Sequence, residues 1–556
     1  MANQKDQWID WRALGVVTLV LLMSVVGCRS SKAPEDQKPA VQLPPGLLIW
    51  AGSENRSLES LVQEFARRKG TRIEMAYYGS GEIAAEISKG AQATPDAIWP
   101  ASSIWIAYGD RKGVVRQSES IMRSPMVLGV RLSAAKQLGW VKNESGYVGH
   151  DITIADLVKA RTSGRLQIGM TSATQSNSGC MAYLGFLYAL SGNPEILEIK
   201  HVRDEKVGKL VSSLLGGFQR SAGSTGFLMD LLLERPELMN AVFTYESLLI
   251  ETNQKLASAG KEPLYAIYLR DGTAIADSPL ALINKGQSEK EAFFKELQQY
   301  LLSNEIQQKI LASGRRTGLL GMNLSGADTA KFNPAWGIDL NKVITPIAVP
   351  SEPVIREALY LYQVAFRKPS LTVFVLDFSG SMGGNGGEQE LKQAMRILLT
   401  PELAAEHLLQ PSPRDISIVI PFSNGADQPL VAKGNDMGQL MPVLTAVETK
   451  TAGGGTSLYH AAAEAFRVLN EYAAEAGKYH MSVIVMTDGE PTDSQEAFTS
   501  GVFGFSLRKD VPIYPILFGS AAKKEPMEWL VSQSYGKVFD GSKDLAKAMR
   551  EAKGYN

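Results

Sequence analysis

Apolar and polar positions in the first half of the chain alternate between the spacing of strands and that of helices. Residues 47–50 form a short apolar run, and over 58–67 apolar residues recur every three or four positions, as on one helix face. Residues 73–78 then have the composition of a second strand, and a Gly-Ser-Gly turn leads into a predicted helix over 82–89. This order of strand, turn and helix predicts a parallel α/β sheet covered by helices.

The last third of the chain predicts a second α/β unit. Residues 371–376 are almost continuously apolar, as expected for a central strand that is buried on both faces. Further strands are predicted at 416–422, 481–487 and 511–518, with helices at 388–399, 457–474 and 544–553. We therefore predict a doubly wound sheet, whose ligands bind at the carboxyl ends of its strands.

The length of 556 residues requires more than one domain, because single hydrophobic cores stop growing near ~250–300 residues. Between the two α/β units, residues 323–353 are rich in proline and predict a connection, followed by a helix over 354–367. The predicted boundaries are 1–27 for an export signal, 28–44 for a polar tether, 45–322 for the first globular region, 323–369 for the connection with its helix, and 370–556 for the last region. A net charge of −1, with no basic run, argues against nucleic acid as a partner.

The N-terminus has the pattern of an export signal. An apolar stretch over 13–26 is short for a membrane span and ends at Cys28 after small residues, which resembles a bacterial lipobox. The resemblance implies a lipoprotein signal peptide and an N-terminal lipid on Cys28; the alternative is an uncleaved signal anchor in which Cys28 is incidental. If Cys28 carries a lipid, Cys180 has no partner for a disulfide, and its apolar neighbours predict a small core residue in a buried helix.

Oxygen-bearing side chains follow two strands and one glycine-rich loop of the last region. These residues are, in chain order, Asp377, Ser379, Ser381, Thr456 and Asp488. The Asp-x-Ser-x-Ser pattern alone is weak, since Asp and Ser also form turns and helix caps. Three separate segments that end at one edge of the sheet, however, predict a shared site of hard oxygen ligands, which suits Mg²⁺, with Mn²⁺ or Ca²⁺ as alternatives. The glycine-rich segment 383–387 next to it is either a mobile rim beside the metal or a permissive surface turn, and the second interpretation is favoured.

This constellation resembles the metal-ion-dependent adhesion site (MIDAS) of von Willebrand factor A (VWA) domains, over about residues 370–556. The resemblance implies a Rossmann-like VWA domain in which these five residues hold the metal. It also implies a protein partner that approaches the metal with an acidic residue.

The first globular region resembles a two-lobed, type II periplasmic solute-binding protein. The resemblance rests on residues 124–130 and 275–283, which look like the two crossings between lobes, and on 293–318, which look like the terminal helices. It implies a cleft between the lobes for a small solute. Polar residues beside predicted strand ends and helix starts make an oxyanion one expectation. The candidate ligand-binding residues are Ser53, Ser80, Ser176, Ser178, Ser224 and Tyr245.

No enzyme is predicted. The five histidines have no metal-ligand spacing, and the chain contains no phosphate-binding loop, His-Glu-x-x-His pair or Gly-x-Ser-x-Gly elbow. We therefore expect a lipid-anchored, extracytoplasmic binding protein of the cell envelope, at the periplasm or cell surface. One alternative is the solute receptor of an ABC-type transporter with an accessory VWA domain; another is a cytosolic chelatase-like subunit beside an ATPase, which the export signal disfavours.

Overall fold

The computed structural model describes residues 45–141, 151–218, 220–322, 324–340, 344, 346–384, 386–488, 490–519 and 523–553. The predicted export signal, the tether and Cys28 lie outside these residues. In the part of the chain that is described, no helix has the length and apolar character needed to cross a membrane.

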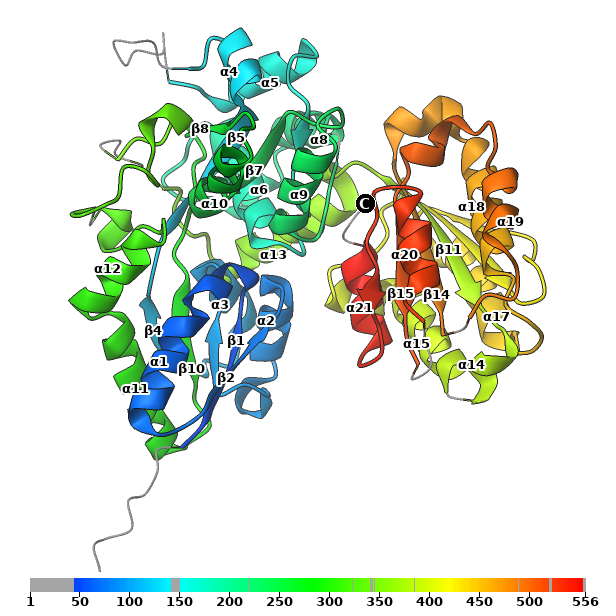
Figure 1. Cartoon of the computed structure of the whole chain (residues 1–556), viewed down its shortest axis with the longest axis horizontal. Coiled ribbons are helices and arrows are strands. Elements are labelled where there is room, and N and C mark those ends of the chain that lie inside the picture. The colour runs from blue at the N-terminus through cyan, green and yellow to red at the C-terminus, as the bar shows by residue number, and fades with distance from the viewer. Residues whose placement is uncertain are drawn as a thin grey trace, which may run out of the picture. The chain divides into compact units, whose positions relative to one another are not determined.

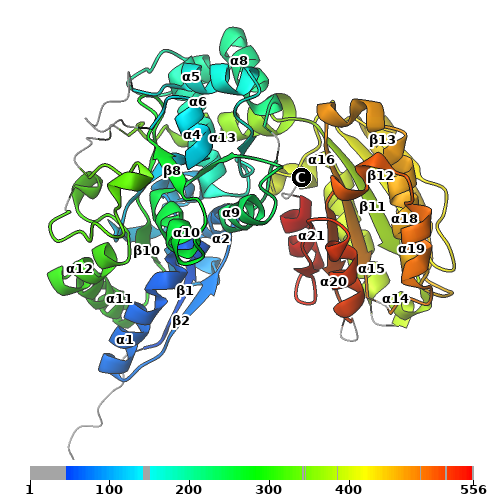
Figure 2. The same cartoon turned by 45° about the horizontal axis from the view of Figure 1, so that its top comes forward.

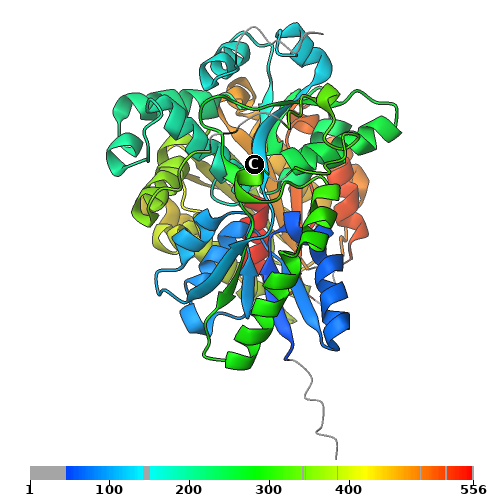
Figure 3. The same cartoon turned by 90° about the vertical axis from the view of Figure 1, so that its left-hand side faces the viewer.

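The first region has two lobes, each built on its own sheet (Figure 1). In the first lobe the order is β2 (Ile73–Tyr77), β1 (Leu47–Ala51), β3 (Ala97–Trp99), β10 (Pro279–Ile283) and β4 (Val115–Ser120). β1 is parallel to β2 and β3, whereas β10 runs antiparallel to β3 and β4. The helices of this lobe are α1 (Glu59–Lys69), α2 (Ser80–Ile87), α3 (Ser103–Gly109), α11 (Ser288–Leu301) and α12 (Asn304–Ala312), and a 3-10 helix spans Ser53–Leu58. The green helices α11 and α12 lie beside the blue elements of this lobe in Figure 3, and both pack into the same core as α1.

The second lobe has the strand order β6 (Ile168–Gly169), β7 (Ala241–Tyr245), β5 (Ser124–Arg131) and β8 (Leu264–Ile267), with β9 (Ile275–Ala276) paired to β5. Its helices are α4 (Leu132–Gln137), α5 (Ile154–Thr162), α6 (Asn177–Leu190), α7 (Ile199–Val202), α8 (Glu205–Gly216), α9 (Thr225–Glu234) and α10 (Glu246–Ser258). The chain enters this lobe along β5 and leaves it through β9 and β10. The predicted crossing segments are therefore confirmed.

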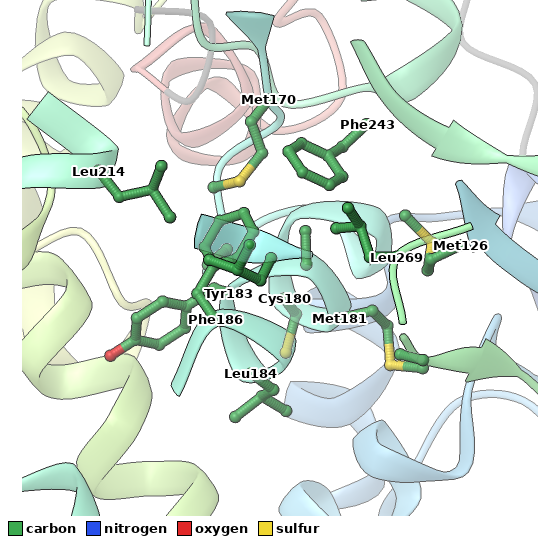
Figure 4. Close-up of a cluster of buried hydrophobic side chains, with 14 of the residues drawn as sticks. Met126, Met170, Cys180, Met181, Tyr183, Leu184, Phe186, Leu214, Phe243 and Leu269 are labelled. Carbon is green, nitrogen blue, oxygen red and sulfur yellow. The ribbon is translucent and has the colours of Figure 1, made fainter. Parts of the chain in front are cut away.

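Helix α6 forms the centre of the second lobe. Its residues from Asn177 to Tyr188 are buried, because apolar side chains occupy every face of the helix instead of one stripe. Cys180 lies among buried methionine, leucine and aromatic side chains (Figure 4). Burial without a charged neighbour raises the pKa of its thiol to about 12, so Cys180 is a core residue, as predicted.

The predicted connection over 323–369 is only partly a linker. Phe332, Trp336 and Ile338 are buried around a 3-10 turn at Pro334–Trp336, which contacts β8. Helix α13 (Glu352–Leu361) then continues as a turn of π-helix at Tyr362–Phe366, and its Ala358 carbonyl accepts a hydrogen bond of 2.8 Å from the hydroxyl of Tyr183. The proline content predicted a connection between domains, but the aromatic residues between the prolines pack onto the second lobe.

The last region is a doubly wound sheet, as predicted, with the order β13 (Leu430–Lys433), β12 (Ile416–Phe422), β11 (Ser370–Asp377), β14 (His480–Thr487), β15 (Ile513–Leu517) and β16 (Phe539–Asp540). Only β13 is antiparallel to its neighbour. One face is covered by α18 (Leu458–Asn470), α19 (Gln495–Gly501) and α20 (Glu525–Ser532), and the other by α15 (Gly387–Leu399), α17 (Met437–Thr449) and α21 (Leu545–Lys553). Figure 2 shows α18 and α19 together on one side of this sheet. Two short helices, α14 (Gly380–Gly384) and α16 (Pro401–Glu406), complete the unit.

Candidate functional site

The carboxyl edge of the last sheet brings the five predicted metal-site residues into one region. β11 ends at Asp377, and the neighbouring β14 ends one residue before Asp488, in register with β11. The loop before Thr456 is fixed to this edge by two backbone hydrogen bonds, from the N–H of Gly453 to the Phe378 carbonyl at 2.8 Å and from the N–H of Gly380 to the Gly454 carbonyl at 3.1 Å. Three segments that are distant in sequence thus meet where the strands end.

Hydrogen bonds connect four of these residues directly. The hydroxyl of Ser381 donates to Oδ1 of Asp488 at 2.8 Å and lies 3.1 Å from the hydroxyl of Ser379. The backbone N–H of Ser379 donates to Oδ1 of Asp377 at 2.7 Å, and the Thr487 hydroxyl donates to Oδ2 of Asp377 at 2.5 Å. Both carboxylates are therefore held by donors at the positions where the strands end.

The electrostatics of this edge favour a cation. Burial raises the pKa of Asp377 above its ordinary value, and the nearby charge of Asp488 raises it further, although hydrogen bonds oppose the shift. Burial likewise raises the pKa of Asp488. A cation bound at this edge would offset the free-energy cost of burying two carboxylate charges. The described residues contain no group of three or more His, Cys, Asp or Glu side chains that would hold a metal, so a metal here needs the hydroxyl groups as ligands.

Thr456 lies in a loop whose support was not predicted from the sequence. Its N–H donates to the Thr492 hydroxyl at 3.0 Å, and the N–H of Thr492 donates back to the Thr456 carbonyl at 2.9 Å. Oδ1 of Asn424 accepts from the N–H of Gly455 at 2.6 Å. Asn424 follows β12 and Thr492 follows β14. Their position shortly after buried strands is the sequence feature that could have predicted their role in supporting this loop.

The glycine-rich segment beside the site is not simply a surface turn. Helix α14 contains Gly383 and Gly384, and α15 begins at Gly387. The exposed Gly384 and Gly386, the latter with a φ of +76°, agree with the predicted surface turn, and the structure adds that the serine motif starts a short helical turn which the glycines continue.

The two lobes of the first region meet at the polar segments predicted for the cleft. A Cβ atom on Gly81, in α2 of the first lobe, would lie only 3.1 Å from the carbonyl oxygen of Thr174 in the second lobe. The indole N–H of Trp105 in the first lobe donates to Oδ1 of Asn177 at 2.8 Å. Nδ2 of Asn177 in turn donates to the hydroxyl of Tyr245 at 2.9 Å. Trp105 and Asn177 were not among the predicted site residues.

The predicted serines are divided between the lobes. Ser53 is exposed at the start of the 3-10 helix, and Ser80 is buried at the start of α2. In the second lobe, the Ser178 hydroxyl lies 3.2 Å from that of Ser176 and 2.6 Å from that of Thr225, which follows Ser224, the N-terminal cap of α9. The second-lobe serines therefore lie close together, whereas Ser53 and Ser80 lie on the opposite lobe.

Glu54 was not among the predicted site residues. Burial raises the pKa of its carboxyl group to about 7, against smaller opposing effects of its own backbone, Arg315 and Ser53. It lies three residues after the end of β1, in the first turn of the 3-10 helix, so its place beyond a strand end was visible in the sequence, but the burial of its carboxyl group was not.

Two family models match the chain. Residues 47–316 match the model described as a bacterial extracellular solute-binding protein, and residues 372–490 match the model described as a von Willebrand factor type A domain. The first match contains both lobes, and the second contains the five residues at the sheet edge. The comparison with curated proteins found no match.

Solved structures of the same two kinds are similar to parts of the chain. A solute-binding protein of an ABC transporter from Thermotoga lettingae, bound with alpha-D-tagatose, has 13% identity and a TM-score of 0.43, covering 57% of this chain and 93% of that one. Iron-bound HitA from Pseudomonas aeruginosa has 15% identity and a TM-score of 0.41, covering 57% and 98%. A von Willebrand factor type A protein from Catenulispora acidiphila has 18% identity and a TM-score of 0.28, covering 34% and 43%.

Proposed function

Because the chain joins a bacterial extracellular solute-binding domain to a von Willebrand factor type A domain, we propose that it is a lipid-anchored, extracytoplasmic binding protein. The solute-binding family implies the location outside the cytoplasm, and lipidation of Cys28 supplies the anchor. The VWA domain recognises a protein partner through a divalent metal, and the solute-binding domain captures a small molecule. No catalytic step is part of this proposal.

One arrangement of side chains supports the proposed metal site. Asp377 and Asp488 lie at one sheet edge, both with pKa values raised by burial, and the Ser381 hydroxyl contacts Asp488 while its neighbour Ser379 contacts Ser381. The residues that hold Mg²⁺ in this proposal are Asp377, Ser379, Ser381, Thr456 and Asp488, with Mn²⁺ or Ca²⁺ as alternatives. The bound ion supplies an open coordination position for an acidic side chain of the partner. Neutral hydroxyl ligands leave much of the charge of the ion uncompensated, which favours such a partner.

A pull-down from an envelope extract in Mg²⁺ or in EDTA tests this mechanism. We expect partners to bind the wild-type protein in Mg²⁺ only, and the Asp377→Ala variant in neither condition. Asp427→Ala is the matched control, because Asp427 is an exposed carboxylate of the same domain that pairs with Lys450 instead of the site residues. Equal recovery of partners by the wild type in both conditions would refute the metal-dependent mechanism.

The match to the solute-binding family also favours a second function, that of a receptor which delivers a solute to a membrane transporter. In that case the VWA domain is accessory. Mass spectrometry of the natively purified protein tests the solute capture that both functions require. A retained solute, together with equal recovery of protein partners in Mg²⁺ and in EDTA, would favour the receptor, whereas partner binding that depends on Mg²⁺ would favour the docking protein.

A further inference from the structure

One half-buried acidic side chain of the solute-binding domain, Glu54, forms no ion pair with the described residues, because the arginines nearest to it pair with other acids. Glu54 follows β1, next to the exposed Ser53, and its Oε1 atom is buried with no hydrogen-bond partner among the described residues. Gly52 leaves the space for this carboxyl group, since a Cβ atom there would lie 2.1 Å from Oε1. A buried acceptor without a donor is costly, and this indicates a partner that the chain itself does not provide.

The nearest cations already bind other acids. The guanidinium of Arg315 donates from Nη2 to Oε1 of Glu251 at 2.7 Å, and it reaches the carbonyl of Glu54 at 3.4 Å instead of the carboxylate. Arg316 is fully buried against both carboxylate oxygens of Glu246, at 2.7 Å each. Each arginine therefore pairs with an acid of α10 in the second lobe, and Arg315, Ser53 and the backbone of Glu54 compensate only part of the charge of Glu54.

Glu54 lies close to the opposite lobe. The guanidinium of Arg315 contacts both the carbonyl of Glu54 and the carboxylate of Glu251 in the second lobe. The charge of Glu54 also contributes to the raised pKa of Tyr245, which ends β7 of the second lobe and whose hydroxyl is bonded to Asn177. Glu54 thus lies where the first lobe meets the second lobe, beside residues predicted to line the cleft.

From this arrangement we infer that the cleft binds a small solute that carries a positively charged amine, with Glu54 as its counter-ion. The inference rests on the proposed solute-binding function and names the class of the solute. An amine supplies both the donor that Oε1 lacks and the missing charge, whereas an oxyanion places a second negative charge beside a buried carboxylate. The oxyanion expected from the polar sequence segments is therefore disfavoured.

Titration calorimetry of the full-length protein at pH 8 tests the inference, with putrescine, glucosamine, glucose and molybdate as probes. Glucosamine and glucose form a matched pair that differs by one amine. We expect binding of at least one amine and no binding of glucose or molybdate. In the Glu54→Gln variant, which keeps the shape of the side chain, amine affinity should fall at least tenfold. Glu54→Asp should retain measurable amine binding, because the charge remains.

Glu74→Gln is the control variant, since Glu74 is an exposed acid of β2 in the same lobe, and its amine affinity should equal that of the wild type. Molybdate or glucose binding that is unchanged by Glu54→Gln would overturn the inference but leave the solute-binding function in place. An absence of amine binding to the wild type would also overturn it. The solute-binding function is then judged separately, by mass spectrometry of solute retained on native purification.

Discussion

Buried or half-buried carboxyl groups are the main support for the proposed function of both domains. At the edge of the VWA sheet, Asp377 and Asp488 are buried near each other, and backbone and hydroxyl donors compensate only part of their charge. In the solute-binding domain, Glu54 lacks even that compensation on one oxygen. Buried acids of this kind destabilise the unliganded fold, so a positively charged partner would stabilise the fold at each position.

Glu54 gives a prediction about pH at this scale. Its pKa is raised from 4.5 to about 7 in the folded protein, so folding free energy is lost as the pH rises from about 4.5 to about 7, and the loss is complete above that. Glu54→Gln should therefore be more stable than the wild type at pH 8, by on the order of 2–3 kcal/mol, and the difference should vanish near pH 4. Urea unfolding at both pH values measures this.

The Glu74→Gln variant should show no such pH-dependent gain in the free energy of unfolding, because Glu74 is an exposed side chain of β2. Equal stability of the wild type and Glu54→Gln at pH 8 would show that the carboxyl group is not buried in the free protein.

At the scale of elements, the loop before α18 determines where Thr456 lies. Gly454 has a φ of +87°, and a Cβ atom there would lie 2.7 Å from Nδ2 of Asn424. Oδ1 of Asn424 also accepts a hydrogen bond from the N–H of Gly455, so the same side chain sets both the shape of the loop and its distance from β12. The glycines of this loop are therefore not equivalent.

Gly454→Ala should consequently impair the metal site, whereas Gly453→Ala should not. A left-handed backbone conformation and a close contact together cost roughly 1–3 kcal/mol in the first variant. We expect the increase in Tm on adding Mg²⁺ to shrink or disappear in Gly454→Ala and to persist in Gly453→Ala, whose added Cβ meets nothing within 4 Å. Differential scanning fluorimetry in Mg²⁺ and EDTA tests this, and identical Mg²⁺ responses of the two variants would contradict the role of the loop.

At the scale of the whole molecule, the proposed function requires that the two domains be held outside the cytoplasm. Of the two cysteines, Cys28 follows the predicted export signal and Cys180 is buried in α6. Cys28→Ser should therefore move the protein from the membrane fraction to the soluble or unprocessed fraction, and it should abolish labelling by a clickable fatty acid.

Cys180→Ala is the matched control, because it removes the other thiol without a change of charge. It should keep both lipid labelling and membrane association. Labelling of the Cys28→Ser variant at the wild-type level would show that Cys28 is not the lipidated residue.

The sequence by itself determined the class of the fold and which oxygen-bearing side chains follow the strands of the VWA sheet. Buried parallel strands must be apolar along their whole length, so the strands that precede Asp377 and Asp488 were recognisable, and so were the polar residues that follow them. The crossings between lobes were likewise predicted, because residues 124–130 and 275–283 resemble the crossing strands of type II solute-binding proteins.

Only the tertiary structure decided which polar residues lack a partner. In the sequence, Glu54, Glu246 and Glu251 are equivalent acids, and Asn177 is one polar residue among several. The fold places an arginine against Glu246 and another against Glu251, joins Asn177 to Trp105 and Tyr245, and leaves Oε1 of Glu54 without a donor. Charge compensation and burial depend on contacts between segments that are distant in the chain, and local sequence patterns do not encode those contacts.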